Sequence, residues 1–285
     1  MPDAPPAALG SVVALARYPV KSMMGEELNA AEVTERGLLG DRAFAVVDRA
    51  DGKVASAKNP RKWGRLFDFR AAFVEPPRRG APLPPVRITL PDGTIAGSEQ
   101  PDVERLLSRA VGREATLSRT PPETPSVEYI PAPDAEETVV DIGAFMMQGT
   151  FFDYAAVHLL TTATLDRLRA LYPGGRFEVR RFRPNIVVEA PAGAAGFVEN
   201  AWVGRTLAIG DEVRLNVTTP CPRCVMTTLP QGDLPKDPGI LRAAAEHNCI
   251  PVPLAGDAPM PSVGVYAFVA RGGTVRRGDA VRLAD

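Results

Sequence analysis

The stretch Leu207-Ala208-Ile209-Gly210-Asp211-Glu212-Val213 consists of an apolar run, a Gly-Asp turn and the start of a second run. Residues 274–283 repeat this pattern, with Gly278-Asp279 at the turn. Glycine and aspartate suit tight turns between paired strands, because both tolerate backbone angles that other residues avoid. Each stretch therefore predicts a β-hairpin. Such hairpins close small barrels, so we expect a β-barrel in the C-terminal part of the chain.

Similar short runs recur along the whole chain, which contains 29 prolines and 25 glycines. Both residues interrupt helices, so long helices are not expected. The pattern predicts strands at residues 11–17, 42–48, 86–90, 94–96, 157–160 and 182–188. It predicts short helices at residues 103–110 after an Asp102 cap, at 163–171 after a Thr161 or Thr162 cap, and at 239–246. The predicted fold class is mainly β with short helices (α+β).

Residues 121–137 are rich in proline and acidic residues and show no periodicity, so we interpret them as a linker. The linker divides the chain into a smaller β-rich domain at residues 1–120 and a domain at residues 138–285 that holds the expected barrel. A chain of 285 residues is long enough for two such domains. The predicted architecture is therefore a barrel packed on a smaller N-terminal domain.

The composition bounds the partners and the compartment. A formal net charge of −1 argues against a general nucleic-acid binder and against binding to anionic membranes. One of the three cysteines must stay unpaired, which suits a reducing compartment. The first residues lack signal-peptide features, and no apolar run approaches the roughly 18 residues of a spanning helix. These observations predict a cytoplasmic protein with no nucleic-acid or membrane partner.

The stretch Pro220-Cys221-Pro222-Arg223-Cys224-Val225-Met226-Thr227-Thr228 is the richest in chemistry. A Cys-x-x-Cys pair can form half of a zinc site, but no second closely spaced cysteine or histidine pair is present. A redox dithiol normally opens a helix, and the residues after Cys224 show no clear helical pattern. One interpretation is a single thiolate, activated by Arg223, that ligates a metal held mainly by other groups. Structural zinc or two inert buried cysteines remain the alternative.

Five motifs in a fixed order resemble a known family, the two-domain proteins that carry the C-terminal domain of molybdenum cofactor sulfurases (MOSC) after an N-terminal β-barrel-like domain. The resemblance covers nearly the whole chain. Its motifs are Tyr18-Pro19-Val20-Lys21-Ser22, Gly37-Leu38-Leu39-Gly40-Asp41-Arg42, Arg183-Pro184-Asn185, the Pro-Cys-Pro-Arg-Cys stretch with Thr227-Thr228, and Gly264-Val265-Tyr266-Ala267.

The resemblance implies a bound molybdenum cofactor with Cys224 as metal ligand and catalytic residue. Because a buried phosphate needs cations and hydroxyl groups around it, the matching positions are expected to bind the cofactor: Lys21, Ser22, Arg42, Thr161, Arg183, Asn185, Arg223 and Thr227. Without the motifs, Lys21 and Arg42 are surface charges and Thr161 is only a helix cap. His158 is expected to be a core histidine outside the site. Pro222 stands where some relatives carry a hydroxyl residue.

The resemblance further implies a two-electron reduction of a small N-hydroxylated or N-oxide-type substrate at molybdenum. The chain has no cysteine cluster for an iron–sulfur centre, so a separate electron donor, a reductase or a ferredoxin-type protein, is expected. The alternative is a carrier protein for cofactor or sulfur, with a persulfide on Cys224 and no turnover. The substrate pocket is expected to be shaped by residues 59–63 and 248–261.

Overall fold

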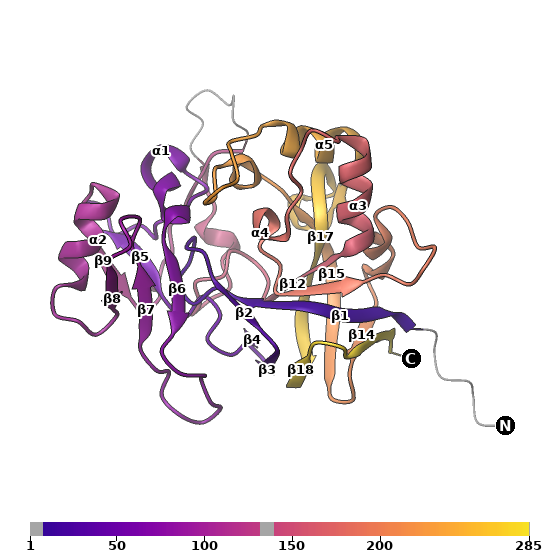
Figure 1. Ribbon diagram of the computed structural model, residues 1–285, viewed down its shortest axis with the longest axis horizontal. Helices are drawn as coiled ribbons and strands as arrows, with labels where there is room; N and C mark the ends of the chain where they lie inside the picture. Colours follow the sequence, from indigo (N-terminus) through magenta and orange to yellow (C-terminus); the bar gives the residue numbers. More distant parts are fainter. Residues whose placement is uncertain (1–7, 132–139, 285) are drawn as a thin grey trace.

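The computed structural model describes residues 8–131 and 140–284. Its main feature is a closed barrel of seven strands, in which β12 pairs with β17 to complete the ring. Figure 1 shows this barrel on the right of the molecule. The prediction of a mainly β chain with a C-terminal barrel is confirmed. In their order around the barrel the strands are β12 (Val157–Thr161), β13 (Ile186–Glu189), β1 (Ala8–Arg17), β19 (Ala280–Leu283), β14 (Thr206–Ile209), β15 (Val213–Pro222) and β17 (Ala258–Arg271).

Buried and less buried side chains alternate along the strands, and the buried ones fill the barrel. In β15, Val213, Leu215 and Val217 are buried while Arg214 and Asn216 between them are not. Successive side chains of a strand point to opposite faces, so one face of each strand supplies the core. The predicted hairpin at Gly210 is confirmed, because β14 and β15 pair in antiparallel register around it. The core includes Val12, Leu15, Leu159, Ile186, Leu207, Val265 and Val281.

The second predicted hairpin, at residues 274–283, is wrong. The strand before its turn, β18 (Gly273–Arg276), pairs with β3 (Ala30–Thr34), whereas β19 pairs with β1 and β14. The turn itself forms, since the Asp279 carboxylate accepts a 2.7 Å bond from the Arg276 amide. However, the Gly278 amide donates to the Val12 carbonyl at 2.7 Å, which ties the turn to β1. The two strands therefore leave the turn toward different sheets.

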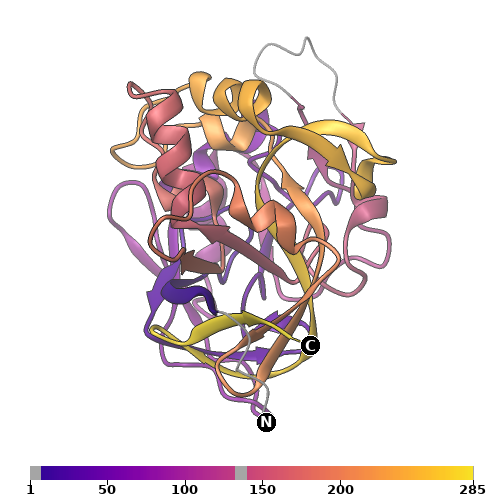
Figure 2. The ribbon, with the colours of Figure 1, turned by 90° about the vertical axis from the view of Figure 1, so that its right-hand side faces the viewer.

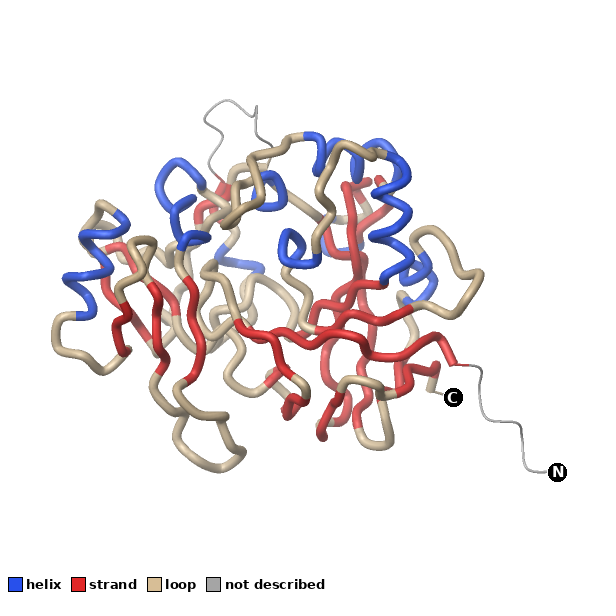
Figure 3. The backbone as a smooth tube through the Cα atoms, viewed as in Figure 1, coloured by secondary structure: helices blue, strands red, loops and turns tan. Residues whose placement is uncertain are grey.

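Helices cover one end of the barrel (Figures 2 and 3). They are α3 (Thr162–Leu171), α4 (Val179–Phe182) and α5 (Gly239–His247). The predicted cap of α3 is confirmed, because Oγ1 of Thr161 accepts a 3.2 Å bond from the Thr164 amide. The strand expected at residues 182–188 starts later, at Ile186, because Phe182 ends α4 and Arg183 has left-handed backbone angles.

The N-terminal half forms a separate lobe on the left of Figure 1. The hairpin predicted at residues 86–96 is confirmed by the pairing of β7 with β8, and the strand predicted at 42–48 starts at Ala45. The helix predicted at 103–110 is present, but the Asp102 carboxylate does not cap it, because it binds Arg105 and Gln100 instead. The elements of this lobe are β5 (Ala45–Asp48), α1 (Pro60–Trp63), η1 (Gly64–Asp68), β6 (Arg70–Phe73), β7 (Val86–Thr89), β8 (Ile95–Gly97), α2 (Val103–Val111) and β9 (Ala115–Ser118). The strands β2 (Glu26–Leu28), β3 and β4 (Gly37–Leu38) lie beside the barrel instead, since β2 pairs with β1 and β3 pairs with β18.

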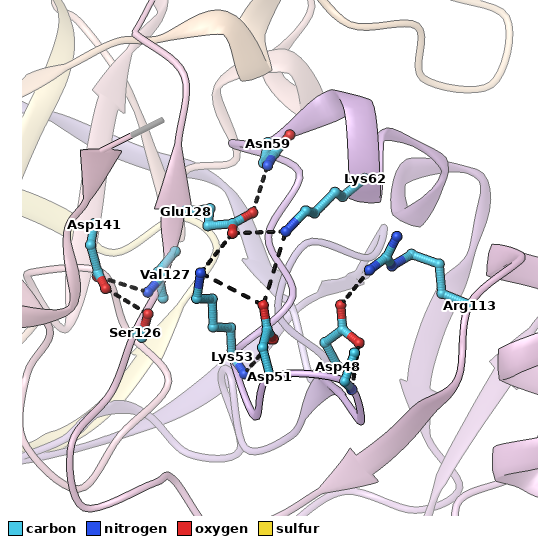
Figure 4. Close-up of polar contacts among 11 residues, drawn as sticks. Asp48, Asp51, Lys53, Asn59, Lys62, Arg113, Ser126, Val127, Glu128 and Asp141 are labelled. Atoms are coloured by element: carbon cyan, nitrogen blue, oxygen red, sulfur yellow. Dashed lines mark hydrogen bonds and ion pairs between the residues drawn. The ribbon is translucent and has the colours of Figure 1, made fainter. Parts of the chain in front are cut away.

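Residues 121–131 of the predicted linker run along this lobe, where the Val54 amide donates to the Ser126 carbonyl and the Ile130 amide donates to the Lys58 carbonyl. The linker strand β10 (Glu128–Tyr129) pairs with β11 (Val140–Asp141), and Glu128 accepts bonds from Lys53, Lys62 and Asn59 (Figure 4). Burial alone would raise the pKa of Glu128, but these three donors lower it to about 2. Residues 132–137 of the predicted linker lie outside the described residues.

The first strand links the two halves of the chain. β1 belongs to the predicted N-terminal domain, yet it pairs with β13 and β19 inside the barrel. The division at residues 121–137 stays a prediction, and the barrel is completed by a strand from before it. No helix among the described residues has the length and apolar character needed to cross a membrane. The remaining elements are η2 (Gly143–Phe145), η3 (Val198–Trp202), η4 (Val225–Thr228), β16 (Cys249–Val252) and η5 (Pro253–Ala255).

Candidate functional site

A cavity of about 250 Å³ lies where the two lobes meet. It is lined by four of the predicted site residues: Arg42, Arg183, Arg223 and Cys224. A smaller adjoining cavity of about 60 Å³ shares Arg42 and Arg183 with the first. Its lining adds three more of the predicted residues: Lys21, Ser22 and Asn185. The structure thus brings seven of the nine predicted positions to one place, with Thr161 and Thr227 as the exceptions.

Three of the cavity residues have unusual backbone angles. The φ angles of Ser22, Arg42 and Arg183 are 63°, 48° and 55°, and in the described chain Asp257 is the other non-glycine residue with a positive φ. Such angles cost of order 1–3 kcal/mol each and persist only where surrounding contacts enforce them. The Arg42 amide donates to the Tyr18 carbonyl at 2.8 Å, and the Arg183 amide donates to Val179 at 3.2 Å. The backbone is therefore strained where the two lobes present cations to the cavity.

The buried ring of Tyr18 supports both arginines. The guanidinium carbon of Arg42 lies 4.6 Å from the ring centre, and that of Arg183 lies 4.1 Å from it. Burial raises the pKa of Tyr18 and lowers that of Arg183 to about 10, so at neutral pH the phenol is neutral and the guanidinium is charged. Cations over an aromatic face gain electrostatic attraction, most of all when desolvated. Tyr18 thus holds one cation from each lobe.

Asn185 lines the smaller cavity, but its side-chain polar atoms are bound to neighbouring groups of the protein. Its side-chain nitrogen donates to the Asp41 carboxylate at 2.9 Å and to the Ala16 carbonyl at 3.3 Å. Its oxygen accepts from the His158 amide at 3.1 Å. Asp41 also accepts from the Tyr18 amide and pairs with Arg42. The amide of Asn185 therefore links β12, β1 and the Asp41-Arg42 turn, and its predicted contact with a cofactor stays a prediction.

Asp153 lies between two lysines at the rim of both cavities. Its carboxylate contacts Lys21 Nζ at 2.5 Å and Lys58 Nζ at 3.2 Å. Burial alone would raise the pKa of Asp153, but the two lysines hold it well below its ordinary value. Burial lowers the pKa of Lys21, an effect that Asp153 opposes. Neither Asp153 nor Lys58 was among the predicted site residues, and the predicted pocket segment starts just after Lys58, at Asn59.

The segment that carries Cys224 is packed between the lobes. The Arg223 amide donates to the Pro261 carbonyl at 2.7 Å, and the next residues form η4. The sequence shows no clear helical pattern after Cys224, whereas the structure has a four-residue 3-10 helix there. A side-chain hydroxyl stabilises this short helix: Oγ1 of Thr227 donates to the Cys224 carbonyl at 3.0 Å. In one apolar cluster the segment contacts the N-terminal lobe and the linker: Ala57, Phe67, Ile130, Val225 and Leu229.

The remaining predicted hydroxyl, Thr161, is fully buried and lines neither cavity. Its Oγ1 donates to the Glu199 carboxylate at 2.6 Å while accepting from the Thr164 amide. Thr161 is thus a helix cap in this structure, and the capping alternative accounts for its contacts. Thr227 is also buried and binds the backbone of Cys224.

His158 was expected in the core and outside the site. It is buried, and its Nε2 lies 3.2 Å from the Val263 carbonyl, but it also lines both cavities. A Cβ atom on Gly264 would lie 2.3 Å from Nε2, so a glycine is needed beside the ring. Tyr266 packs against the same ring with a centroid separation of 5.6 Å. The Gly264-Val265-Tyr266 motif therefore contributes to the site by shaping the surroundings of His158.

The charges around the larger cavity favour an anionic ligand. Four cations, Arg42, Lys58, Arg183 and Arg223, line it together with one carboxylate, that of Asp153. In the described part of the chain no carboxylate lies within 4.0 Å of the Arg183 or Arg223 nitrogens. A buried cation without a carboxylate partner is costly, so an anion placed beside Arg183 and Arg223 is stabilised. Residues 8–131 and 140–284 contain no cluster of three or more His, Cys, Asp or Glu side chains placed to hold a metal.

A second set of lining residues is apolar. Tyr129, Ile142, Leu254, Ala255 and Met260 face the same cavity as Cys224. Three of these come from residues 248–261, which were expected to shape the pocket. Residues 59–63 supply none of the lining, and the neighbouring Lys58 does so instead. A partly exposed thiol, a cationic wall and an apolar wall thus meet in one cavity, which suits a soft metal carried by an anionic group beside a small organic molecule.

Comparison with known proteins finds relatives that align over nearly the whole chain. Human mitochondrial amidoxime-reducing component 1 is 25% identical over 96% of this chain and 83% of its own length. Human mitochondrial amidoxime reducing component 2 is 26% identical over the same shares. The crystal structure of the YUAD protein from Bacillus subtilis, 11% identical, aligns over 96% of this chain and 94% of that chain with a TM-score of 0.47.

Two family models match the chain in sequence. The MOSC N-terminal beta barrel domain matches residues 9–73, and the MOSC domain matches residues 147–282. The first match contains Lys21, Ser22 and Arg42, and the second contains Arg183 and Cys224. The cavity lies between these two regions, and the chain belongs to the family of proteins that join an MOSC N-terminal domain to an MOSC domain.

Proposed function

We propose that this protein is a molybdenum-cofactor-binding oxidoreductase that reduces small N-hydroxylated compounds, of the amidoxime or N-oxide type. The observation that carries the proposal is the single cavity in which the Cys224 thiol faces four cations and an apolar wall. The curated relatives of similar length are named for amidoxime reduction, which supports this substrate class.

The residues present fit a pyranopterin cofactor. Cys224 would supply the thiolate ligand to the metal, and Lys21, Ser22, Arg42 and Arg183 would surround the phosphate end. The smaller cavity concentrates these cations with a hydroxyl group, the donor set that phosphate oxygens require. When bound, the cofactor would supply the two-electron change that removes oxygen from the substrate as water.

The protein's own groups would position the reactants. Lys21 and Lys58 keep Asp153 ionised at the rim, and the Tyr18 ring holds Arg42 and Arg183 in place. The apolar residues Tyr129, Ile142 and Met260 would exclude water and contact the organic part of the substrate. Each turnover consumes two electrons and two protons, and we propose that the electrons come from a separate donor protein.

Expression in a host that makes molybdenum cofactor tests the proposal. Stoichiometric molybdenum and pterin are expected in the wild type, with reduction of a benzamidoxime-type compound by a dye reductant. Cys224→Ser is expected to lose turnover, while Cys249→Ser, at an exposed thiol, serves as matched control. Bound cofactor without turnover of any N-hydroxylated compound would support the carrier alternative. Absence of molybdenum and pterin from the wild type would refute the reductase and the cofactor carrier, and a persulfide on Cys224 would then indicate a sulfur carrier.

A further inference from the structure

Cys221 has no part in the proposed function, yet it is the most enclosed thiol of the chain. Its exposed fraction is 0%, whereas Cys224 is partly exposed and Cys249 is exposed. A buried cysteine usually behaves as a small apolar residue and packs against other apolar groups. Cys221 instead contacts a charged side chain, so packing alone does not explain its position.

The charged neighbour is Arg223, whose Nη1 lies 2.8 Å from the Cys221 sulfur. The other terminal nitrogen, Nη2, donates to the Phe182 carbonyl at 3.0 Å, and Nε is buried with no partner in the described residues. In that same part of the chain no carboxylate lies within 4.0 Å of the guanidinium. The sulfur is therefore the one side-chain acceptor that this structure shows bound to Arg223.

Groups from three other segments face the same sulfur. They are His158 of β12, Tyr266 of β17 and Lys58 after β5. Burial alone would raise the pKa of Cys221, but Arg223 and then His158 outweigh burial and lower it to about 6. Tyr266, whose pKa is raised by burial and by the sulfur, stays a neutral phenol and so a hydrogen-bond donor. The surroundings thus favour an anionic sulfur that accepts from the Arg223 guanidinium.

We propose that Cys221 is a positioning residue, whose sulfur fixes the Arg223 guanidinium at the cavity wall beside Cys224, and that it is not a second metal ligand. The expected effect of Cys221 on turnover rests on the proposed function, but the contact between its sulfur and Arg223 does not. Arg223 adjoins Cys224 in the chain and lines the larger cavity, so any change in its orientation alters the charge next to the reactive thiol. Removal of the acceptor would leave the guanidinium in contact with Phe182, whose carbonyl accepts at 3.0 Å and whose ring centre lies 5.7 Å from the guanidinium carbon.

The first test uses protein without cofactor, so it is independent of the proposed function. In a Cys224→Ser, Cys249→Ser background Cys221 is the single thiol, and its ionisation is followed by thiolate absorbance between pH 5 and 9. The expected midpoint is about 6. Adding Arg223→Gln is expected to move the midpoint above about 8.5, the ordinary value for a thiol. A midpoint above 8 with Arg223 in place would overturn the proposal.

Should Arg223→Gln fail to fold, as judged by circular dichroism, Arg223→Lys is the second variant. Lysine keeps the charge but not the paired contacts to Sγ and Phe182, so an intermediate midpoint is expected. An unchanged midpoint in a folded Arg223→Lys or Arg223→Gln protein would show that Arg223 does not fix the sulfur.

The second test uses cofactor-loaded protein and compares Cys221→Ala with Cys221→Asp. Aspartate is close to cysteine in size and supplies an anion for Arg223. Molybdenum content is expected to stay within about twofold of wild type in both, while kcat/KM falls about tenfold in Cys221→Ala and largely recovers in Cys221→Asp. Loss of molybdenum from Cys221→Ala as complete as from Cys224→Ser would make Cys221 a metal ligand. Equal defects in both variants would reduce its role to packing.

Discussion

The guanidinium of Arg183 lies 4.1 Å from the centre of the Tyr18 ring, and this contact joins the barrel lobe to the N-terminal lobe at the cavity. The Tyr18 hydroxyl also donates to the Pro184 carbonyl at 3.3 Å. Arg183 in turn donates to the Met23 carbonyl at 2.7 Å. The motif at Tyr18 and the motif at Arg183 therefore hold each other in place, and the shape of the cavity depends on both.

Replacement of Tyr18 by leucine is expected to lower the free energy of unfolding by about 2–4 kcal/mol, because a buried ring and two cation contacts are lost. The same change is expected to reduce cofactor retention, since Arg42 and Arg183 lose their support. Urea unfolding and molybdenum content measure the two effects. Tyr18→Phe keeps the ring and serves as control, with an expected loss of about 1 kcal/mol or less. Equal losses in both variants would contradict the role of the ring.

Gly264→Ala is expected to disturb the site through His158. A Cβ there would lie 2.3 Å from Nε2 of His158 and 2.4 Å from the Leu159 carbonyl, and the φ of Gly264 is 80°. We expect a loss of unfolding free energy of about 3 kcal/mol or more, from backbone strain together with overpacking. Thermal or urea unfolding measures this loss.

Gly256→Ala is the matched control for Gly264. Gly256 has a similar φ of 65°, but no heavy atom lies within 4 Å of the Cβ position. Only the backbone penalty applies there, so a loss of about 1 kcal/mol is expected. A loss at Gly264 no larger than at Gly256 would show that His158 and Leu159 give way without cost.

Local features of this chain were predictable and pairings between distant segments were not. The hairpin around Gly210 forms because adjacent residues pair, whereas Gly278 binds Val12, a partner far away in the sequence. Four of the five motifs supplied the seven predicted site residues that line the two cavities. Lys58 and Asp153 were missed because their ion pair joins a loop of one lobe to the entry of the other. Neither residue belongs to a motif, so only the fold brings them together.

Glu128 anchors the linker strand β10, and its removal is expected to weaken the fold in a pH-dependent way (Figure 4). Its pKa in the folded protein is about 2, below the ordinary 4.5, so its stabilisation is complete above pH 4.5 and is lost as the pH falls toward 2. Glu128→Gln is expected to lower the free energy of unfolding by roughly 1–2 kcal/mol at pH 7 and by less at pH 3, as measured by urea titration.

The control for Glu128 is Glu246→Gln, at a carboxylate whose side chain is 60% exposed and which lies 3.9 Å from Nε2 of His247. A change within about 0.5 kcal/mol is expected there. If the Glu128→Gln effect is the same at pH 3 and pH 7, ionic anchoring of β10 is refuted.

For Glu199 we expect the opposite dependence of protein stability on pH. Its carboxyl is fully buried behind α3, where Oε2 accepts from the hydroxyls of Thr161 and Thr164 at 2.6 Å each and Oε1 has no partner among the described residues. Burial raises its pKa above the ordinary 4.5, an effect that the two hydroxyls only partly oppose. The neutral acid is therefore the form that the fold prefers.

A group with a raised folded pKa contributes stability that is complete below its ordinary pKa and is lost as the pH rises through the folded value. The wild type is thus expected to lose stability as the pH rises above 4.5, relative to Glu199→Gln, which keeps an acceptor for both hydroxyls and cannot ionise. Urea midpoints of the two proteins at several pH values between 4 and 9 measure the difference. Thr164→Val removes one donor to Oε2 and is expected to raise the pKa of Glu199 further, so its loss of stability with pH continues to a higher pH. A difference between wild type and Glu199→Gln that does not change with pH would show that the pKa of Glu199 is the same in the folded and unfolded protein, and burial would then not favour its neutral form.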